Sequence, residues 1–331
     1  MKLHRLFASL CLLGSISAEG QLTGGFFQDN AQLTARFFLD KPNFARGEPV
    51  FLYFRLANRG PDTVMIVPVN QEQPYCSGIS ISVSSDPLPT SSCPFLGGQG
   101  CNENGPLPVP RPLLAGETYV ARFVLNFDHK FSAPGEYRVN AKHANSQMST
   151  NAQAELTFRV NAEYFAPSKF QPWLDQLKSE DRQKRIEAAR VLASLAPPSL
   201  EDTLLGFAAN PETRRYAPLA LYRLNTRRSI EALAHLVTEE PINVKAAQYL
   251  AETGDQRWYP LLRDAAVKNA RISAYPAYAA ELGGEKMLPV LVALAESPDT
   301  KFTRLNAVMA MAARQQCRSH ATSDQPSKLW S

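Results

Sequence analysis

The first half of the chain alternates apolar and polar residues over short segments that end at Gly, Pro, Asn or Asp. Segment 50–57 shows this period of two clearly, since one face would carry Val50, Leu52, Phe54 and Leu56. The pattern predicts a strand with one buried face, followed by a turn at 58–61. Similar patterns occur at 33–40, 63–69, 79–84, 119–127, 137–143 and 154–160. Seven short strands of this kind predict a β-sandwich.

The second half repeats with a period of 29 residues. We call the first recurring set the anchors: Leu195, Leu224, Thr253, Leu282 and Met311. Apolar residues recur three positions before the anchors, at Leu192, Leu221, Leu250, Ala279 and Val308. They recur again nine positions after the first four anchors, at Leu204, Leu233, Leu262 and Leu291, and twelve positions after them, at Phe207, Leu236, Ala265 and Leu294. Each unit therefore predicts a helix that ends near its anchor, a short turn and a second helix.

Glycine and proline support this division into helices. Glycine lies in the turns 253–255 and 282–285, as Gly254 and as Gly283 with Gly284, at the ends of two predicted first helices, where glycine commonly terminates a helix in the left-handed conformation. Pro260 and Pro289 lie near the starts of the next helices, where proline is tolerated.

Composition changes near residue 167. Residues 19–167 contain 12 glycines and 13 alanines, whereas residues 168–318 contain 4 glycines and 26 alanines. We therefore expect a multidomain, all-β plus all-α protein, in which a β-sandwich (19–163) is joined by a linker (164–169) to an α-solenoid (170–317). Residues 318–331 are polar and lack the repeat pattern, and we expect a disordered tail there.

Two resemblances accompany this division. The sequences LDKP at 39–42, RGEPV at 46–50, NRG at 58–60 and PGEYRV at 134–139 resemble bacterial secreted immunoglobulin-like domains. Some sandwiches with this opening are proteinase inhibitors, so the resemblance implies inhibition as one function. The sequence AAQYLAETGD at 246–255, with PLL at 260–262, is similar to HEAT-like repeats of the phycobilisome-lyase type, as is AELG at 280–283 with PVL at 289–291.

The N-terminus predicts export. Residues 1–5 are basic, residues 6–16 are apolar, and small residues lead up to Ala18. This order predicts a secretory signal peptide at 1–18, since the apolar stretch is too short to span a bilayer. Its removal would delete Lys2 and Arg5 and no acidic residue, lowering the formal charge from +4 to +2. We therefore expect a periplasmic or secreted protein without a membrane span and without a charge imbalance suited to nucleic acid.

The remaining cysteines are Cys76, Cys93, Cys101 and Cys317. In an oxidising compartment an even number favours disulfides, and the expected pair is Cys93 with Cys101, which bracket a Gly-rich loop. Pairing of Cys76 with either of them stays open. The spacing matches no zinc site, and we expect no metal or cofactor.

Aromatic and polar residues of the third and fourth units are the candidate partner-binding residues: Tyr249, Trp258, Tyr259, Tyr278, His235, Arg263 and Asp264. Tyr249 and Tyr278 lie one period apart and are expected to share a row. His235, Arg263 and Asp264 are expected to face outward on second helices, which commonly line the concave face of HEAT-type solenoids. Aromatic residues with polar ends are favoured at interface hot spots, although they also fill space between repeats.

No catalytic signature is present, since the chain lacks H-E-x-x-H, G-x-S-x-G, Walker and dinucleotide-binding motifs. The expected function is therefore that of an exported, non-catalytic scaffold that binds another protein through the solenoid. One alternative is an extracellular proteinase inhibitor that acts through the Cys-, Gly- and Pro-rich loop 86–112. The other is a lyase-type enzyme, against which the signal peptide argues because such lyases act in the cytosol.

Overall fold

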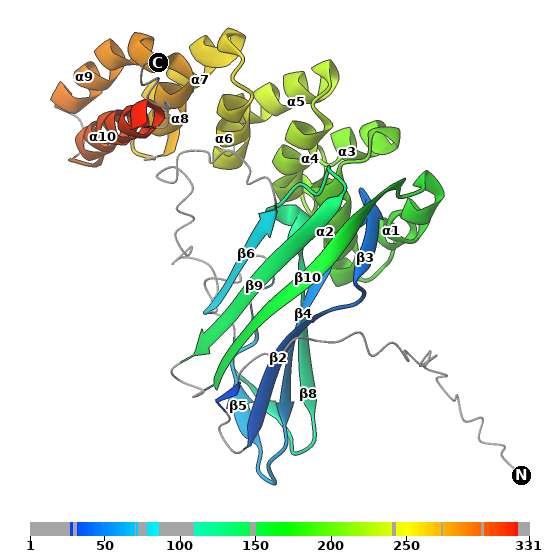
Figure 1. The fold of residues 1–331 in the computed structure, drawn as a ribbon. Helices are drawn as coiled ribbons and strands as arrows, with labels where there is room; N and C mark the ends of the chain where they lie inside the picture. Colours follow the sequence, from blue (N-terminus) through cyan, green and yellow to red (C-terminus); the bar gives the residue numbers. More distant parts are fainter. Residues whose placement is uncertain are drawn as a thin grey trace, which may run out of the picture.

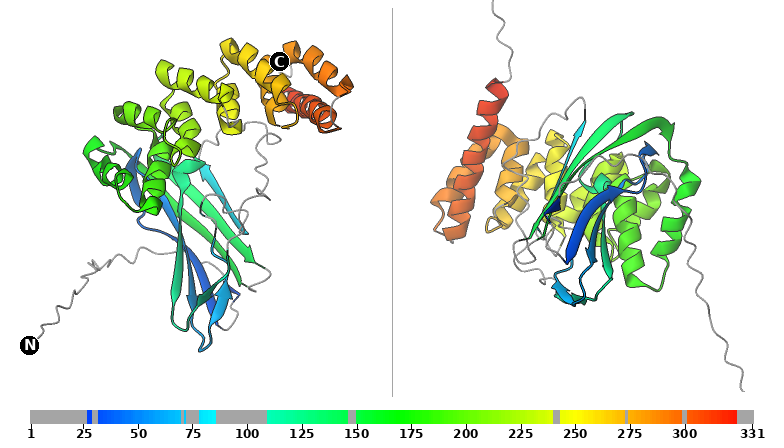
Figure 2. Two further views of the ribbon diagram at one scale, coloured as in Figure 1. Left: turned by 180° about the vertical axis from the view of Figure 1, so that it is seen from behind. Right: turned by 60° about the horizontal axis from the view of Figure 1, so that its bottom comes forward.

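The structure is a computed structural model that describes residues 27–28, 32–69, 71, 78–85, 109–145, 150–239, 243–272, 274–298 and 301–323. A β domain lies below, and an α-helical solenoid extends from its upper end (Figure 1). Two further views show the same arrangement, with the last helices reaching away from the β domain (Figure 2). The signal peptide predicted at 1–18 lies outside the described residues.

The β domain consists of two main sheets and one small sheet. The first sheet has the order β1-β10-β9-β6, with β3 parallel to β10, and its strands are β1 (Phe27–Gln28), β3 (Asn43–Arg46), β6 (Ile79–Ser85), β9 (Gly135–Asn145) and β10 (Thr150–Tyr164). The second has the order β2-β4-β8 and contains β2 (Leu33–Leu39), β4 (Phe51–Asn58) and β8 (Thr118–Val124). The small sheet pairs β5 (Val64–Ile66) with β7 (Arg111–Leu113).

The two main sheets share one apolar core. Phe54 of β4 lies against His143 of β9, with ring centroids 4.7 Å apart, so the sheets pack face to face as in a sandwich. The buried face of β4 is the alternating one predicted from the sequence. The strand predicted at 119–127 ends earlier, because residues 125–127 form a short 3-10 helix, η2 (Leu125–Phe127). The short strands β1, β3 and β7 had no sequence pattern of their own.

The solenoid begins with η3 (Pro167–Phe170) and α1 (Gln171–Leu177). The first helices of successive repeats are α2 (Arg182–Leu195), α4 (Ala217–Leu224), α6 (Val244–Glu252), α8 (Ala274–Gly283) and α10 (Lys301–Ser323). The second helices are α3 (Glu201–Gly206), α5 (Arg227–Thr238), α7 (Tyr259–Lys268) and α9 (Leu288–Glu296). Short 3-10 turns precede some of them: η4 (Pro198–Leu200), η5 (Arg214–Tyr216), η6 (Gln256–Trp258) and η7 (Gly284–Met287).

Left-handed residues end the first helix in each of the first four repeats. The positive φ angles occur one or two residues after the anchors, at Ala196, Asn225, Gly254 and Gly284. This conformation stops the helix because its backbone no longer continues the hydrogen-bond ladder. Proline at the first or second position then opens α4, α7 and α9. The predicted pattern of helix, turn and second helix is confirmed in these repeats.

The fifth repeat differs from the expectation. The helix α10 continues to Ser323, past residue 318 where the sequence predicts a tail. No left-handed residue follows Met311 in the part of the chain described up to Ser323, and the next residues, Ala312 and Ala313, are good helix formers. A polar sequence can therefore extend a helix whose start is anchored by packing on α8 and α9. Residues 324–331 lie outside the described part of the chain.

The β domain contacts the start of the solenoid through a mixed interface. Phe51 of β4 packs against Trp173 of α1, with ring centroids 5.9 Å apart, and forms a small buried cluster with Val124 and Val191. The cluster couples the outer side of the second sheet to α2. None of the described helices combines the length and the hydropathy needed to cross a membrane.

Candidate functional site

An open cleft lies where the β domain meets the first helices of the solenoid. Its volume is about 550 Å³. It is lined by Phe127, Asp128 and Lys130 on the β-domain side and by residues of α4 and α6 on the other, including Tyr222, Lys245 and Tyr249. We call this the interdomain cleft. It exists only because the turn after β8 is held against α4.

Arg223 of α4 holds the two walls together. Its guanidinium donates a hydrogen bond to the carbonyl oxygen of Phe127 at 3.0 Å and further hydrogen bonds to the carbonyl oxygens of Asn126 and Ser194. Asn126 in turn accepts a hydrogen bond from the backbone N–H of Val50 at 2.6 Å, which ties η2 to the sandwich. Burial lowers the pKa of Arg223, but a guanidinium stays charged at any ordinary pH. The charged Arg223 side chain therefore links the two domains through hydrogen bonds.

Two stacked tyrosines form the solenoid wall of the cleft. The rings of Tyr222 and Tyr249 lie 4.8 Å apart at 10° to one another. Tyr222 hydrogen-bonds to Glu252, which also accepts from Gln248 Nε2 at 2.8 Å. Burial raises the pKa of Tyr249 well above its usual value. Both phenols thus stay protonated. The Tyr222 hydroxyl is already bonded to Glu252, so Tyr249 is the phenol that can donate to a bound molecule.

Charge along the first helices changes sign once, between the second and third repeats. The position just before the anchor is Arg223 in the second repeat, Glu252 in the third and Glu281 in the fourth. Burial and the nearby carboxylate of Glu252 raise the pKa of Glu281. On the β-domain side, burial raises the pKa of Asp128 and, across the cleft, lowers that of Lys245. The cleft therefore presents Asp128 and Lys130 on the β-domain side and Lys245 and Glu252, at the two ends of α6, on the solenoid side.

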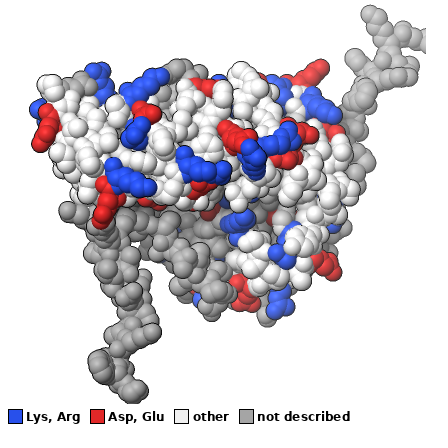
Figure 3. Space-filling model, turned by 90° about the horizontal axis from the view of Figure 1, so that it is seen from above, with Lys and Arg blue, Asp and Glu red and all other residues white. Residues whose placement is uncertain are grey.

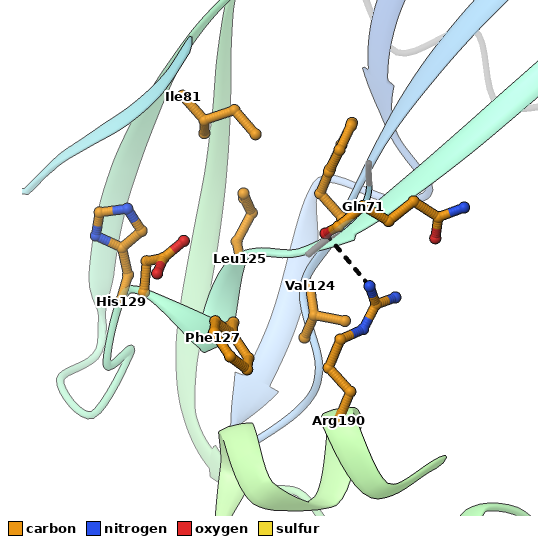
Figure 4. A pocket seen from close by; sticks show the side chains of 9 residues that line it. Gln71, Ile81, Val124, Leu125, Phe127, His129 and Arg190 are labelled. Atoms are coloured by element: carbon orange, nitrogen blue, oxygen red, sulfur yellow. Dashed lines mark hydrogen bonds between the residues drawn. The ribbon is translucent and has the colours of Figure 1, made fainter. Parts of the chain in front are cut away.

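A second and much smaller cavity lies deeper in the interface. It holds about 30 Å³ between the end of β8 and α2, enough for water but not for a ligand. Figure 4 shows Arg190 reaching from α2 to donate to the carbonyl oxygen of Gln71, at 3.3 Å, with His129 on the far side. Burial lowers the pKa of His129, so its ring favours the neutral form. This small cavity is therefore part of the packing between the domains and not a ligand-binding site.

The structure separates the predicted partner-binding residues into different places. Tyr249 lines the interdomain cleft, and Tyr278 is buried behind it, donating to Gln248 Oε1 at 3.4 Å. The ring that stacks on Tyr249 is that of Tyr222, whereas Tyr278 hydrogen-bonds to Gln248. Burial raises the pKa of Tyr278 to about 12.

Trp258 and Tyr259 lie between repeats. The Tyr259 hydroxyl donates to the carbonyl oxygen of Lys286 at 2.9 Å, and its ring lies directly over Gly283. The indole N–H of Trp258 is buried and has no hydrogen-bond partner among the described residues. Tyr259 therefore fills space between the third and fourth repeats, and Trp258 packs partly buried against the same core.

His235, Arg263 and Asp264 lie on α5 and α7, in the second-helix layer that faces away from the β domain (Figure 1). His235 and Asp264 are largely exposed, and Arg263 Nη2 pairs with its neighbour Asp264 at 2.7 Å. The first helices, not these second helices, face the β domain. The structure thus places these three residues on the opposite layer from Tyr249.

The arginines of the repeats are mostly paired with carboxylates. Arg185 pairs with Glu212 at 2.7 Å, Arg227 with Glu231 at 2.8 Å, and Arg214 with Glu239. Viewed from above, the solenoid shows Lys or Arg beside Asp or Glu along its length (Figure 3). Mixed charge of this kind keeps a surface solvated without creating a field of one sign.

Sequence reasoning missed Tyr222, Arg223, Lys245 and Asp128 as cleft residues. The residue 29 positions before Tyr249 is Ala220, not Tyr222, so the period of 29 residues does not pair the two tyrosines. The sequence does show that charged residues recur just before the anchor, at Arg223, Glu252 and Glu281. It does not show that the β domain lies beside this position.

The predicted disulfide between Cys93 and Cys101 lies outside the described residues, as does most of loop 86–112. Of that loop the structure describes 109–112, where Val109 is largely exposed. Among the described residues, no group of three or more His, Cys, Asp or Glu side chains is arranged to hold a metal ion.

Comparison with known proteins agrees with this architecture. A family model for HEAT repeats matches residues 170–247, which cover α1 to α5 and the start of α6. No curated protein matches the chain. The fold is thus a β domain followed by an α-solenoid with HEAT repeats, a class of repeat that generally mediates protein–protein interaction.

Proposed function

We propose that this chain is an exported, non-catalytic scaffold that holds a segment of a partner protein in the interdomain cleft. The stacked pair Tyr222 and Tyr249, set opposite the β-domain turn, carries this proposal. Tyrosine rings combine an apolar face with a hydroxyl edge that forms hydrogen bonds, which suits a peptide better than a purely apolar ligand. Export rests on the predicted signal peptide.

The charges of the cleft specify the chemistry of the segment. Lys130 and Asp128 lie on the β-domain side, Lys245 and Glu252 lie at the two ends of α6, and Glu281 lies one repeat farther along. A segment with acidic residues at one end and basic residues at the other matches this order, since like charges placed opposite one another oppose binding. We therefore propose a polar peptide segment of mixed charge that lies along the first helices.

Affinity capture with cleft variants tests the proposal. Full-length mature protein is used to capture partners from the secreted and periplasmic fractions of the source organism, beside Tyr249→Ala and Lys245→Glu. A partner captured by the unaltered protein should be reduced about tenfold by either substitution, since each removes a hot-spot contact. Arg263→Glu on the opposite layer is the matched control and should capture normally. Retention by both cleft variants, or loss only with Arg263→Glu, contradicts the proposal.

The inhibitor alternative makes a different prediction. A proteinase bound through loop 86–112 would still be captured by Tyr249→Ala and Lys245→Glu, and its activity would fall on binding. Deletion of residues 168–331 would leave that inhibition intact, whereas it would abolish capture through the interdomain cleft.

A further inference from the structure

The far end of the solenoid exposes a face that the repeats elsewhere bury. Six apolar side chains form this face, which we call the solenoid end face: Leu288 and Val292 of α9, and Phe302, Leu305, Val308 and Met309 of α10. An exposed apolar patch on neighbouring helices of a soluble protein is often functional.

The repeat pattern shows that these are core positions. Val308 belongs to the column of Leu192, Leu221, Leu250 and Ala279, each of which is 0% exposed, yet Val308 is 51% exposed. Leu305 and Met309 likewise lie one period after Pro276 and Ala280, which are buried in α8. The difference lies in the neighbours: α6 packs against α4 and α8 as well as α5 and α7, whereas α10 packs against α8 and α9.

The exposure of the large apolar residues of α10 does not arise because the helix presents the wrong face to the solenoid. Its buried residues are small or polar, namely Thr303, Asn306, Ala307 and Ala310. Asn306 Nδ2 donates to the carbonyl oxygen of Ala270 at 3.1 Å and so fixes the rotation of α10. The large apolar residues therefore point away from the solenoid.

Within the described residues, the chain does not supply the missing helix where its own repeat would place it. Positions nine and twelve residues after Met311 are His320 and Ser323, where the other repeats carry apolar residues. Both belong to α10, which runs straight through the expected turn. The end face thus has the geometry of a site for one further helix, packed on α10 and α9 as α5 packs on α4 and α3.

Charge identifies the kind of helix. The sequence of α10 contains Lys301, Arg304, Arg314 and Arg318 and no Asp or Glu. Lys301 and Arg304 are exposed, and neither forms an ion pair with a described residue. A second copy of α10 would place cations against cations, whereas an acidic helix would place carboxylates beside them.

We infer that the solenoid end face binds an acidic amphipathic helix of a partner protein, which completes the fifth repeat as its second helix. The partner helix presents two apolar residues three positions apart to Leu305, Val308 and Met309. Its carboxylates flank this pair and face Lys301 and Arg304. This site is separate from the interdomain cleft, so an experiment can contradict one of the two proposals without contradicting the other.

A synthetic peptide that imitates a second helix tests the inference. The probe is a fluorescent peptide of residues 226–239, the α5 segment with Leu233 and Leu236, carrying Arg227→Glu, Arg228→Glu and His235→Glu. These three side chains are exposed in the solenoid, so the substitutions leave the apolar face unchanged. A second peptide carries lysine at the same three positions. Anisotropy should show binding of the acidic peptide to the full mature chain, and at least about tenfold weaker binding of the basic one.

Variants of the protein locate the site. Val308→Glu and Leu305→Gln should each weaken binding of the acidic peptide about tenfold. Val267→Glu on α7 is the matched control, because Val267 is 52% exposed, as Val308 is at 51%, but lies outside the end face. Unchanged circular dichroism and melting temperature show that the variants are folded.

Four outcomes overturn the inference. They are no binding of the acidic peptide, equal binding of both peptides, binding that Val308→Glu leaves intact, and a different occupant of the face. A dimer in analytical ultracentrifugation that Val308→Glu dissociates would identify the occupant as a second copy. Sedimentation with phosphatidylglycerol vesicles that Val308→Glu abolishes would identify it as a lipid surface.

Discussion

Arg223 of α4 donates to the carbonyl oxygen of Phe127 in η2 at 3.0 Å, across the boundary between the solenoid and the β domain. One side chain thus satisfies backbone acceptors of both domains, including Ser194 at the end of α2. Charged donors bound to buried carbonyls contribute more than neutral ones, and their loss leaves acceptors unsatisfied. The relative position of the domains, and with it the interdomain cleft, depends on this residue.

Replacement of Arg223 should therefore uncouple the domains. Arg223→Ala is expected to destabilise the interface by about 3 kcal/mol, because several hydrogen bonds from a charged donor are lost together. Differential scanning calorimetry should show the β domain and the solenoid melting in separate transitions. Arg223→Lys keeps the charge but not the planar set of donors. Its interface should be less stable than that of the unaltered protein and more stable than that of Arg223→Ala. A single transition with unchanged midpoint in Arg223→Ala would falsify this role.

The ion pair between Arg122 of β8 and Glu187 of α2 crosses the same boundary. Arg122 also lies over the ring of Phe51 at 4.6 Å, so its guanidinium is held in place on both sides. Glu187→Arg should destabilise docking by about 1 kcal/mol, the upper end for a pair at a partly exposed site. The exchanged pair Arg122→Glu with Glu187→Arg should recover part of that loss in urea denaturation. No recovery in the double variant would show that the two charges are not coupled.

His143 makes the stability of the sandwich depend on pH. It is 2% exposed and packs against Phe54, and burial lowers its pKa from 6.5 to about 4. Between these values the unfolded chain takes up a proton that the folded chain does not. The free energy of unfolding should therefore be at its full value above pH 6.5 and fall by up to about 3 kcal/mol as the pH drops to about 4.

The variant His143→Leu removes this titration and keeps an apolar side chain of similar size. Its midpoint in urea should change less between pH 7 and pH 4.5 than that of the unaltered protein. Equal pH dependence of both proteins would exclude His143 as the cause.

Substitution of Gly283 tests the packing between repeats, and substitution of Gly206 is its control. A Cβ atom at Gly283 would lie 2.1 Å from Tyr259 Cε2, whereas a Cβ at Gly206 meets nothing within 4 Å. Gly283→Ala should destabilise the solenoid by about 1–3 kcal/mol, because the Tyr259 ring must move. Gly206→Ala should be neutral or stabilise it by up to about 1 kcal/mol, since alanine favours the helix. Thermal unfolding followed by circular dichroism decides the order, and equal melting temperatures would contradict it.

The sequence by itself determined the two-domain architecture and the helices of four repeats. These features are local, since an alternating strand such as 51–58 needs only its own pattern. A helix that stops after Leu224 needs only a left-handed residue such as Asn225. The period of 29 residues was enough to place the buried column from Leu192 to Ala279. It also predicted that Val308 belongs to that column, although not that Val308 would be exposed.

Only the tertiary structure decided the site. Arg223 and Phe127 lie 96 positions apart, and no pattern links them until the β domain is docked on α2 and α4. The same docking turns the first helices, rather than the second, toward the β domain, which places Tyr249 in the cleft and His235 on the far layer. Such relationships depend on how two independently patterned surfaces fit together. That fit is set by side-chain shape and hydrogen bonding across the interface, which a one-dimensional period does not contain.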